Sequence, residues 1–98
     1  MPLQIFMSEK TLEKYLKNKV EKYGGKFFKF VSPGMAGVPD RILLYPFGGI
    51  KFIEMKDTGK KLEPLQIKRA KELKALGHDV RCIDSKQEID DLVKEVFG

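Results

Sequence analysis

The chain has 98 residues, of which 42% are hydrophobic and 34% are charged, with one cysteine and a formal net charge of +5. This length fits one domain, this composition excludes a disordered chain, and the single cysteine excludes an internal disulfide. No apolar run approaches the ~20 residues that a membrane-spanning helix needs. The start, MPLQIFMSEK, lacks the features of a signal peptide, so we expect a cytoplasmic protein.

The first predicted element is a helix from about Ser8 to Tyr23. Ser8 is a favourable N-cap, the apolar residues after it recur at helical spacing, and Gly24-Gly25 ends the helix. Residues 26–31, KFFKFV, are rich in aromatic side chains, which predicts a strand. We expect Phe27, Phe28, Phe30 and Phe52 to lie in the core. The glycines and prolines of residues 32–39 predict a loop.

Two further strands, 41–45 and 50–56, flank the sequence PFGG, which predicts a β-hairpin. A second helix is predicted to begin at Pro64, where the missing N–H is tolerated, and to end at Gly77. A short strand at 79–83 and a helix at 85–97, which opens with an S-x-x-E capping box, complete the order α-β-β-β-α-β-α. This order predicts an α/β fold with a mixed β-sheet flanked by helices.

The positive charge is concentrated in one part of the chain. Residues 84–98 hold five acidic side chains and two lysines, a local sum of −3, so residues 1–83 carry +8. This excess suits a polyanionic partner, above all nucleic acid. A lysine-rich surface that serves only solubility has the same composition, so the charge alone leaves both explanations open.

Charged residues lie at the ends of the otherwise apolar hairpin strands: Asp40 before the first strand, and Glu54 and Lys56 at the end of the second. Side chains alternate across a strand, so Glu54 and Lys56 share one face. A carboxylate beside an ammonium can hold a cation and activate a water molecule. The simpler explanation is a weak, solvent-exposed ion pair where the strand ends.

The role of Asp40 depends on the hairpin register. A turn centred between Phe47 and Gly48 pairs Asp40 with Met55, which puts the Asp40 side chain on the face opposite to Glu54. A one-residue shift or a bulge brings the two carboxylates onto one face. They would then suit Mg²⁺, with the Met55 backbone carbonyl as a further oxygen ligand. One histidine and one cysteine do not suit a zinc site.

Pro39-Asp40 followed by Glu54-Met55-Lys56 resembles the PD-(D/E)XK nuclease signature, with 13 residues between Asp40 and Glu54. From SEKTLEKY to GHDVRCI, residues 8–83, the chain resembles the virus-type replication-repair nuclease (VRR-NUC) domain. The resemblance implies a restriction-endonuclease-like core and Mg²⁺- or Mn²⁺-dependent DNA cleavage. It implies that Asp40 and Glu54 are metal ligands and that Lys56 is the catalytic lysine. We expect residues 1–98 to form a single domain of this type, with a core at 8–83 and a C-terminal helix at 85–97.

The resemblance also implies further site residues. Glu9 corresponds to an acidic residue on the first helix that would reach the metal through water, and Glu13 is the alternative one turn later. Glu9 would equally suit the helix dipole without any site role. Gln66 corresponds to the glutamine of the family, but at the third position of its helix it would also bond back to the N-cap. The candidates for phosphate contacts are Lys29, Ser32, Arg41, Lys60 and Lys61.

We therefore expect a metal-dependent endonuclease that acts on branched DNA, similar to the Holliday-junction resolvases of phages and prokaryotes. Symmetric cleavage of two strands needs two active sites, which a homodimer supplies. We expect no membrane partner and no small-molecule substrate. The alternatives are a nicking or flap-directed repair nuclease, a non-catalytic DNA-binding module of the same fold, and a structural protein with a basic surface. The last of these predicts that metal ions do not stabilise the fold.

Overall fold

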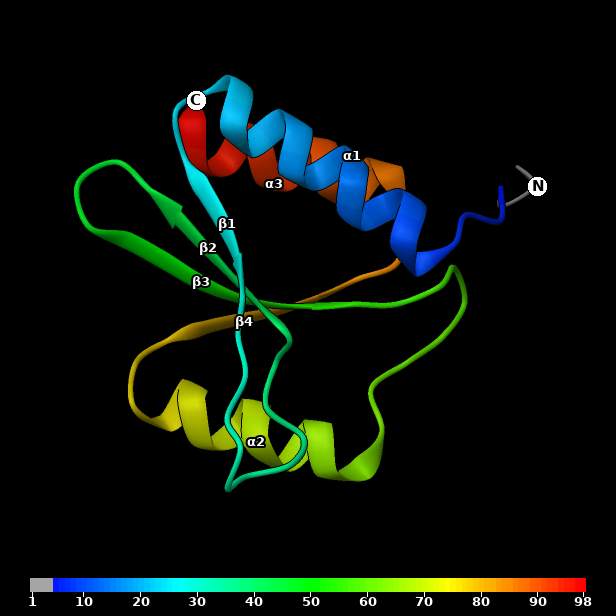
Figure 1. The fold of residues 1–98 in the computed structure, drawn as a ribbon, viewed down its shortest axis with the longest axis vertical. Coiled ribbons are helices and arrows are strands. Elements are labelled where there is room, and N and C mark those ends of the chain that lie inside the picture. The colour runs from blue at the N-terminus through cyan, green and yellow to red at the C-terminus, as the bar shows by residue number, and fades with distance from the viewer. Residues whose placement is uncertain (1–4) are drawn as a thin grey trace.

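The computed structural model of the chain describes residues 5–98. Residues 1–4, which the predicted domain includes, lie outside the described residues. The described part contains three helices and four strands (Figure 1): α1 (Glu9–Lys22), β1 (Lys26–Lys29), β2 (Arg41–Tyr45), β3 (Gly49–Met55), α2 (Pro64–Ala75), β4 (Asp79–Ile83) and α3 (Lys86–Phe97). The order and type of every element agree with the prediction, and the α/β fold class is confirmed.

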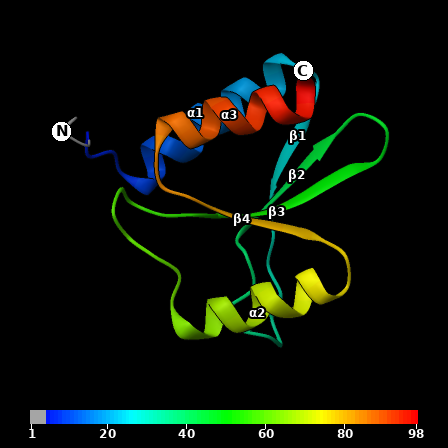
Figure 2. The same ribbon diagram turned by 180° about the vertical axis from the view of Figure 1, so that it is seen from behind.

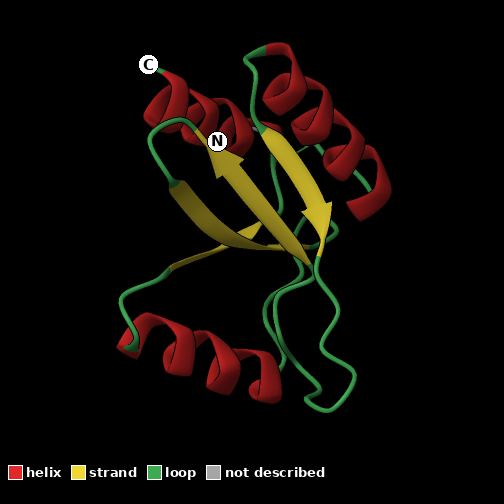
Figure 3. Ribbon diagram, turned by 60° about the vertical axis from the view of Figure 1, so that its left-hand side comes forward, coloured by secondary structure: helices red, strands yellow, loops and turns green. Residues whose placement is uncertain are grey.

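The strands form one sheet in the order β1-β2-β3-β4. The first three strands pair antiparallel, whereas β3 and β4 pair parallel, so the predicted mixed sheet is confirmed. The crossover between the two parallel strands contains α2. Helices α1 and α3 lie side by side on one face of the sheet, and α2 lies on the other face (Figures 1 and 2). Figure 3 shows these three layers with the sheet in the middle.

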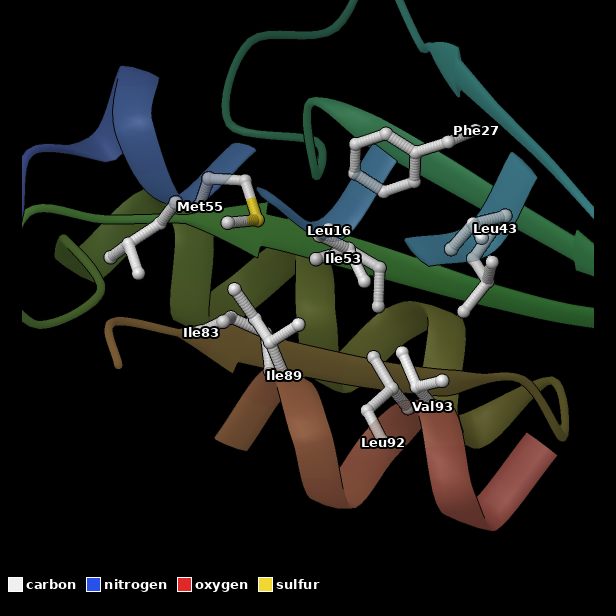
Figure 4. Close-up of a cluster of buried hydrophobic side chains, with 11 residues drawn as sticks. Leu16, Phe27, Leu43, Ile53, Met55, Ile83, Ile89, Leu92 and Val93 are labelled. Carbon is white, nitrogen blue, oxygen red and sulfur yellow. The ribbon is translucent and has the colours of Figure 1, made fainter. Parts of the chain in front are cut away.

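The main hydrophobic core lies between the sheet and the α1–α3 layer, and Figure 4 shows its side chains. The helices contribute Leu12, Leu16, Val20, Ile89, Leu92 and Val93, and the strands contribute Phe27, Leu43, Ile53, Met55 and Ile83. Because Ile53 and Met55 of β3 point into this core, the alternate residues of the strand, Phe52 and Glu54, point toward the α2 side. The core therefore fixes which face of β3 presents its charged end.

The α2 side of the sheet is less well covered. Phe30 and Phe52 are half-buried, with ring centroids 5.7 Å apart. Phe28, which we predicted to lie in the core, is 52% exposed. This prediction was wrong because β1 is an edge strand, and α2 packs instead against β4 at the other edge.

The element ends follow local chemistry. The Ser8 hydroxyl accepts a hydrogen bond from the Thr11 N–H at 3.2 Å, as expected of an N-cap. Strand β1 ends at Lys29, two residues earlier than predicted, although the Phe30 N–H still donates to the Asp40 carbonyl at 2.8 Å. Helix α2 ends at Ala75, before the predicted Gly77. Within the described residues, none of the helices combines the length and the apolar character required to cross a bilayer.

The β2–β3 hairpin has a three-residue turn, in which Tyr45 pairs with Gly49 across Pro46, Phe47 and Gly48. A two-residue turn would need Pro46 to pair with Gly49 and to donate a backbone hydrogen bond. Proline has no N–H, so the closing pair moves back by one residue. The register that we first considered is therefore wrong by one residue.

The corrected register decides the position of Asp40. Arg41 pairs with Ile53, so the next step along the two strands places Asp40 beside Glu54 rather than Met55. Residues directly opposite each other in a sheet share a face. This is the one-residue shift on which the metal-site hypothesis depended.

Phe47 at the hairpin tip has a φ of 66° and a fully exposed ring. A bulky side chain is strained in this left-handed region, whereas asparagine tolerates it. We expect Phe47→Asn to raise the free energy of unfolding by about 1 kcal/mol, as measured by urea denaturation. Phe47→Ala removes the same exposed ring but keeps most of the backbone strain, so it should stabilise much less. Equal effects of the two substitutions would attribute the gain to the lost ring and contradict the strain argument.

Candidate active site

Asp40 and Glu54 meet at one end of the sheet, on the side that faces α2. Asp40 precedes β2 and is partly buried, and Glu54 on β3 is 6% exposed. One carboxylate oxygen of Asp40 (Oδ1) accepts a long hydrogen bond, 3.4 Å, from the Met55 N–H. The N–H and the C=O of a strand residue point to the same side, so the Met55 carbonyl also lies on the Asp40 side of β3. Three oxygen-bearing groups thus converge on one small region.

The two carboxylates destabilise each other's charged form. Burial raises the pKa of Glu54, and the nearby Asp40 charge raises it further, to about 7. Burial also raises the pKa of Asp40. Within residues 5–98, neither carboxylate forms an ion pair with a lysine or arginine. Buried acidic groups in this state favour a cation between them, and hard carboxylate and carbonyl oxygens are the ligands that Mg²⁺ prefers.

Lys56 continues β3 by one residue, because its N–H donates to the Ile83 carbonyl of β4 at 2.9 Å. By strand alternation its side chain lies on the same face as Glu54. Its positive charge lowers the pKa of Glu54, but by less than burial and Asp40 raise it. An ammonium therefore lies next to the carboxylate pair without neutralising it.

The two acidic residues near the start of α1 have different surroundings. Glu13 binds the Arg41 guanidinium, with Nε at 2.9 Å and a second contact from the terminal nitrogen. The pKa of Glu9 is raised by burial first and then by the charge of Asp40. Glu13 is bound by Arg41, whereas within residues 5–98 Glu9 forms no ion pair and lies close enough to Asp40 and Lys56 for both charges to shift its pKa.

A metal ion at this place would have few direct protein ligands. In the part of the chain that the structure describes, no three His, Cys, Asp or Glu side chains lie close enough together to hold one ion. Asp40, Glu54 and the Met55 carbonyl would leave the other coordination positions to water and phosphate oxygens, which is the usual arrangement for Mg²⁺. Glu9 would then act through water.

The side chain of Gln66 on α2 makes two contacts, one with the backbone at the start of its own helix and one with Glu54. Its side-chain oxygen accepts a hydrogen bond from the Glu63 N–H at 2.8 Å, which caps the start of α2. Its side-chain nitrogen lies 3.4 Å from a carboxylate oxygen of Glu54 (Oε1). One side chain therefore caps the helix and also contacts the site.

Asp57 and Thr58, directly after β3, were not singled out from the sequence. One carboxylate oxygen of Asp57 (Oδ1) accepts a 2.6 Å hydrogen bond from the Glu9 N–H. The Thr58 hydroxyl accepts from the Met7 N–H at 3.0 Å and donates to the Asp84 carbonyl at 2.9 Å. These contacts hold the start of α1 beside the end of β3. The available signal was the polar sequence DTG immediately after a buried strand.

The predicted phosphate-contact residues have different environments. Lys29, Lys60 and Lys61 are exposed, and Ser32 is half-buried. The Arg41 guanidinium has partners within the protein: it is bound to Glu13 and also donates to the Asp40 carbonyl at 3.0 Å. These contacts hold α1 against the start of β2 and engage three of the five N–H donors of Arg41.

The loop before Asp40, residues 32–39, contains Gly34 and Gly37. Gly37, with a φ of 87°, lies against α2: a Cβ atom there would come within 2.7 Å of the Leu65 side chain. The Arg69 guanidinium donates to the Ala36 carbonyl at 2.9 Å and fixes the same contact. Gly37 therefore allows the loop to pack on α2. Gly34 has open space around it.

Comparison with known proteins finds a relative with a similar sequence and a solved structure with a similar fold. The chain is 48% identical over 77 residues to "Putative nuclease p44" of Acyrthosiphon pisum secondary endosymbiont phage 1, a match that covers 79% of this chain and 83% of that protein. A solved structure named "VRR_NUC domain" has a TM-score of 0.81 and 29% identity, and the match covers 90% of this chain and 97% of the other. No family model matches the chain. Sequence similarity and fold similarity point to the same group of proteins.

Proposed function

Because the chain belongs to the VRR-NUC family of nucleases, we propose that it is a metal-dependent endonuclease that hydrolyses phosphodiester bonds in branched DNA. The observation that carries the proposal is the pair of buried carboxylates, Asp40 and Glu54. They face each other without an ion-pair partner in residues 5–98 and have Lys56 beside them. A protein that only bound DNA would gain nothing from buried negative charge facing a phosphate.

In this proposal Asp40, Glu54 and the Met55 carbonyl would hold Mg²⁺ or Mn²⁺. When bound, the ion polarises the scissile phosphate and lowers the pKa of a coordinated water molecule. Glu54 must give up its proton before it can act as a ligand, because its pKa without metal is about 7. Lys56 orients the attacking water or stabilises the negative charge that develops on the phosphate.

Two further residues position these groups. Gln66 donates to the Glu54 carboxylate and so selects its orientation, as residues next to metal ligands commonly do. Glu9 approaches the same region from α1 and would act on the metal through water. The Gln66 role is consistent with the contact of its side chain with Glu54, and the Glu9 role with the Asp57 contact that holds the start of α1 near the site. Neither role requires a third carboxylate to bind the metal ion directly.

The proposed preference for branched DNA is coupled to assembly. A chain of 98 residues covers little DNA, and symmetric cutting of a four-way junction requires two active sites related by a twofold axis. We therefore propose a homodimer as the active form. A monomer would fit a nicking or flap-directed nuclease instead, so sedimentation of the protein with and without DNA distinguishes the two.

The test is cleavage of a labelled four-way junction, with linear duplex, nicked duplex and flap DNA as competing substrates, in Mg²⁺, Mn²⁺ or EDTA. We expect metal-dependent cutting of the junction and a loss of about 10²-fold or more in Lys56→Ala. Lys74→Ala, which removes an exposed lysine at the end of α2, is the matched control. Equal cutting of all substrates would discard the junction preference, and preferred cutting of flaps would favour the repair-type nuclease. Tight junction binding without cutting in either metal would favour a non-catalytic module.

A further inference from the structure

Helix α1 carries an excess of positive charge that the candidate active site does not use. Its lysines are Lys10, Lys14, Lys17, Lys19 and Lys22. In the described residues, none of these lysines takes part in an ion pair. Two of the three glutamates on α1 are engaged elsewhere, since Glu9 lies near the carboxylate pair and Glu13 binds Arg41. The third glutamate, Glu21, is exposed on the same side as Lys10, Lys14 and Lys17, so five lysines stand against one free glutamate and the surface of α1 is basic.

The lysines divide into two groups around the helix. At about 100° per residue, Lys10, Lys14 and Lys17 fall on one flank, which we call the α1 lysine flank, and all three are exposed. Lys19 and Lys22 fall on the opposite flank. That opposite flank faces α3, because the hydroxyl of Tyr15 on the same side donates to Asp90 at 2.5 Å.

The α1 lysine flank adjoins the candidate active site. On the helical projection it lies directly beside Glu9 and Glu13, the two residues that connect α1 to the site. Arg41, which binds Glu13, pairs across the sheet with Lys29 of β1, and the exposed Lys29 extends the basic surface to the edge strand. On the other side of Glu9, its N–H contact with Asp57 brings in the loop that carries the exposed Lys60 and Lys61.

We propose that the α1 lysine flank binds the sugar–phosphate backbone of the DNA segment next to the scissile bond. The proposal rests on the proposed function, because it assumes that the carboxylate pair cuts DNA. In this arrangement DNA runs from the Lys60–Lys61 loop across the site to α1. Figure 1 shows the first turn of α1 beside the loop that follows β3. Glu9 at the start of α1 lies between the two basic surfaces.

The dimensions fit a backbone contact. Lys10 and Lys17 are separated by about 10 Å along the helix axis, which is close to the axial rise of about three base pairs of duplex DNA. Lysine side chains are flexible point charges, so they suit phosphates and do not read base sequence. The flank would therefore increase affinity and set the position of the DNA without taking part in the chemistry.

The test compares two variants that lose the same charge from different sides of the molecule. The flank variant is Lys10→Gln, Lys14→Gln and Lys17→Gln, and the control is Lys19→Gln, Lys22→Gln and Lys94→Gln. DNA affinity is measured in EDTA over a range of salt concentrations, and cleavage is measured at saturating DNA with metal. Each lost phosphate contact lowers the slope of log K against log salt by about 0.9, so we expect a decrease of about 2–3 in the flank variant.

We expect the flank variant to bind DNA roughly 10–100-fold more weakly at moderate salt and to cut saturating DNA at nearly the native rate. The control should keep the native salt slope. Shortening the DNA on one side of the cut should weaken its binding to the native chain and leave its binding to the flank variant nearly unchanged. This result would show on which side of the cut the α1 lysine flank contacts the DNA.

Equal losses in the two variants would overturn the proposal in favour of a general charge effect. An unchanged salt slope in the flank variant, with normal cutting by the native chain, would overturn the flank contact and leave the proposed function intact. A slower cleavage rate at saturating DNA with native affinity would place the flank in the chemistry and also overturn it. A native chain that neither binds nor cuts DNA would remove both proposals.

Discussion

Replacing Asp40 with asparagine is expected to abolish metal-dependent DNA cleavage and, at the same time, to stabilise the metal-free protein. The loss of a carboxylate ligand should reduce the cleavage rate by at least about 10²-fold, which corresponds to the several kcal/mol that a metal ion contributes to a phosphoryl transition state. The introduced asparagine would still accept the Met55 N–H through its amide oxygen, so we expect no change of fold. The substitution removes the charge that raises the pKa of the buried Glu54.

The stabilisation should be about 1 kcal/mol at pH 8 without metal. Thermal unfolding with and without Mg²⁺ measures it, alongside cleavage of the preferred DNA. Magnesium should raise the melting temperature of the native chain through binding to the folded state, and this increase should disappear in Asp40→Asn. Asp91→Asn, which removes the same charge from the exposed side of α3, should behave like the native chain. A destabilised Asp40→Asn protein that still responds to Mg²⁺ would contradict the metal-ligand assignment.

The second large effect concerns the pH dependence of stability, because the pKa of Glu54 is raised from 4.5 to about 7 in the folded protein. Below pH 4.5 the group is protonated in both states, and its contribution to the free energy of unfolding is fully present. As the pH rises through 7, the folded protein must release this proton, and the contribution is lost. We expect metal-free stability to fall by about 2–3 kcal/mol between pH 5 and pH 8, which is less than the full shift because the loss already begins between pH 4.5 and pH 5.

Glu54→Gln supplies the matched control for this measurement. Glutamine has a similar shape and does not titrate, while every other ionisable group of the chain remains, so the difference between the two proteins isolates Glu54. The stabilisation by Mg²⁺ should also grow from pH 6 to pH 8 in the native chain, because metal binding must displace the Glu54 proton. If the native chain and Glu54→Gln had the same pH profile, the assignment of the raised pKa to Glu54 would be wrong.

Most of the fold could be predicted from local patterns. The Ser8 cap, the Gly24-Gly25 stop and the apolar spacing of α1 act within one helix, so they can be recognised without knowledge of tertiary structure. The exposure of Phe28 could not be predicted in this way. An aromatic residue in a strand has the same local signature in a central strand and in an edge strand. Only the tertiary arrangement shows that, within the described residues, α2 packs against β4 and leaves the Phe28 side of the edge strand β1 exposed.

The candidate site was predictable in its residue types but not in its geometry. The hydrophobic pattern of the hairpin fits two registers that differ by one residue, and they place Asp40 on opposite faces of the sheet. The missing N–H of Pro46 favours the register with Tyr45 and Gly49 as the closing pair. The general preference for two-residue turns favours the other register. The binding of Arg41 to Glu13 joins residues 28 positions apart in the sequence, and no local pattern reports such a pair.

The two strands of the hairpin also determine where the chain can accept extra residues. Asp40 lies five residues before Tyr45 and Glu54 lies five residues after Gly49, and Tyr45 and Gly49 form the closing pair of the hairpin. A residue inserted into only one of these arms moves one carboxylate to the other face of the sheet, unless a bulge absorbs it. Residues added between Pro46 and Gly48 change neither arm. The hairpin tip is therefore the place to insert a fluorescent label or an affinity tag, and the place where length variation among functional homologues should be concentrated.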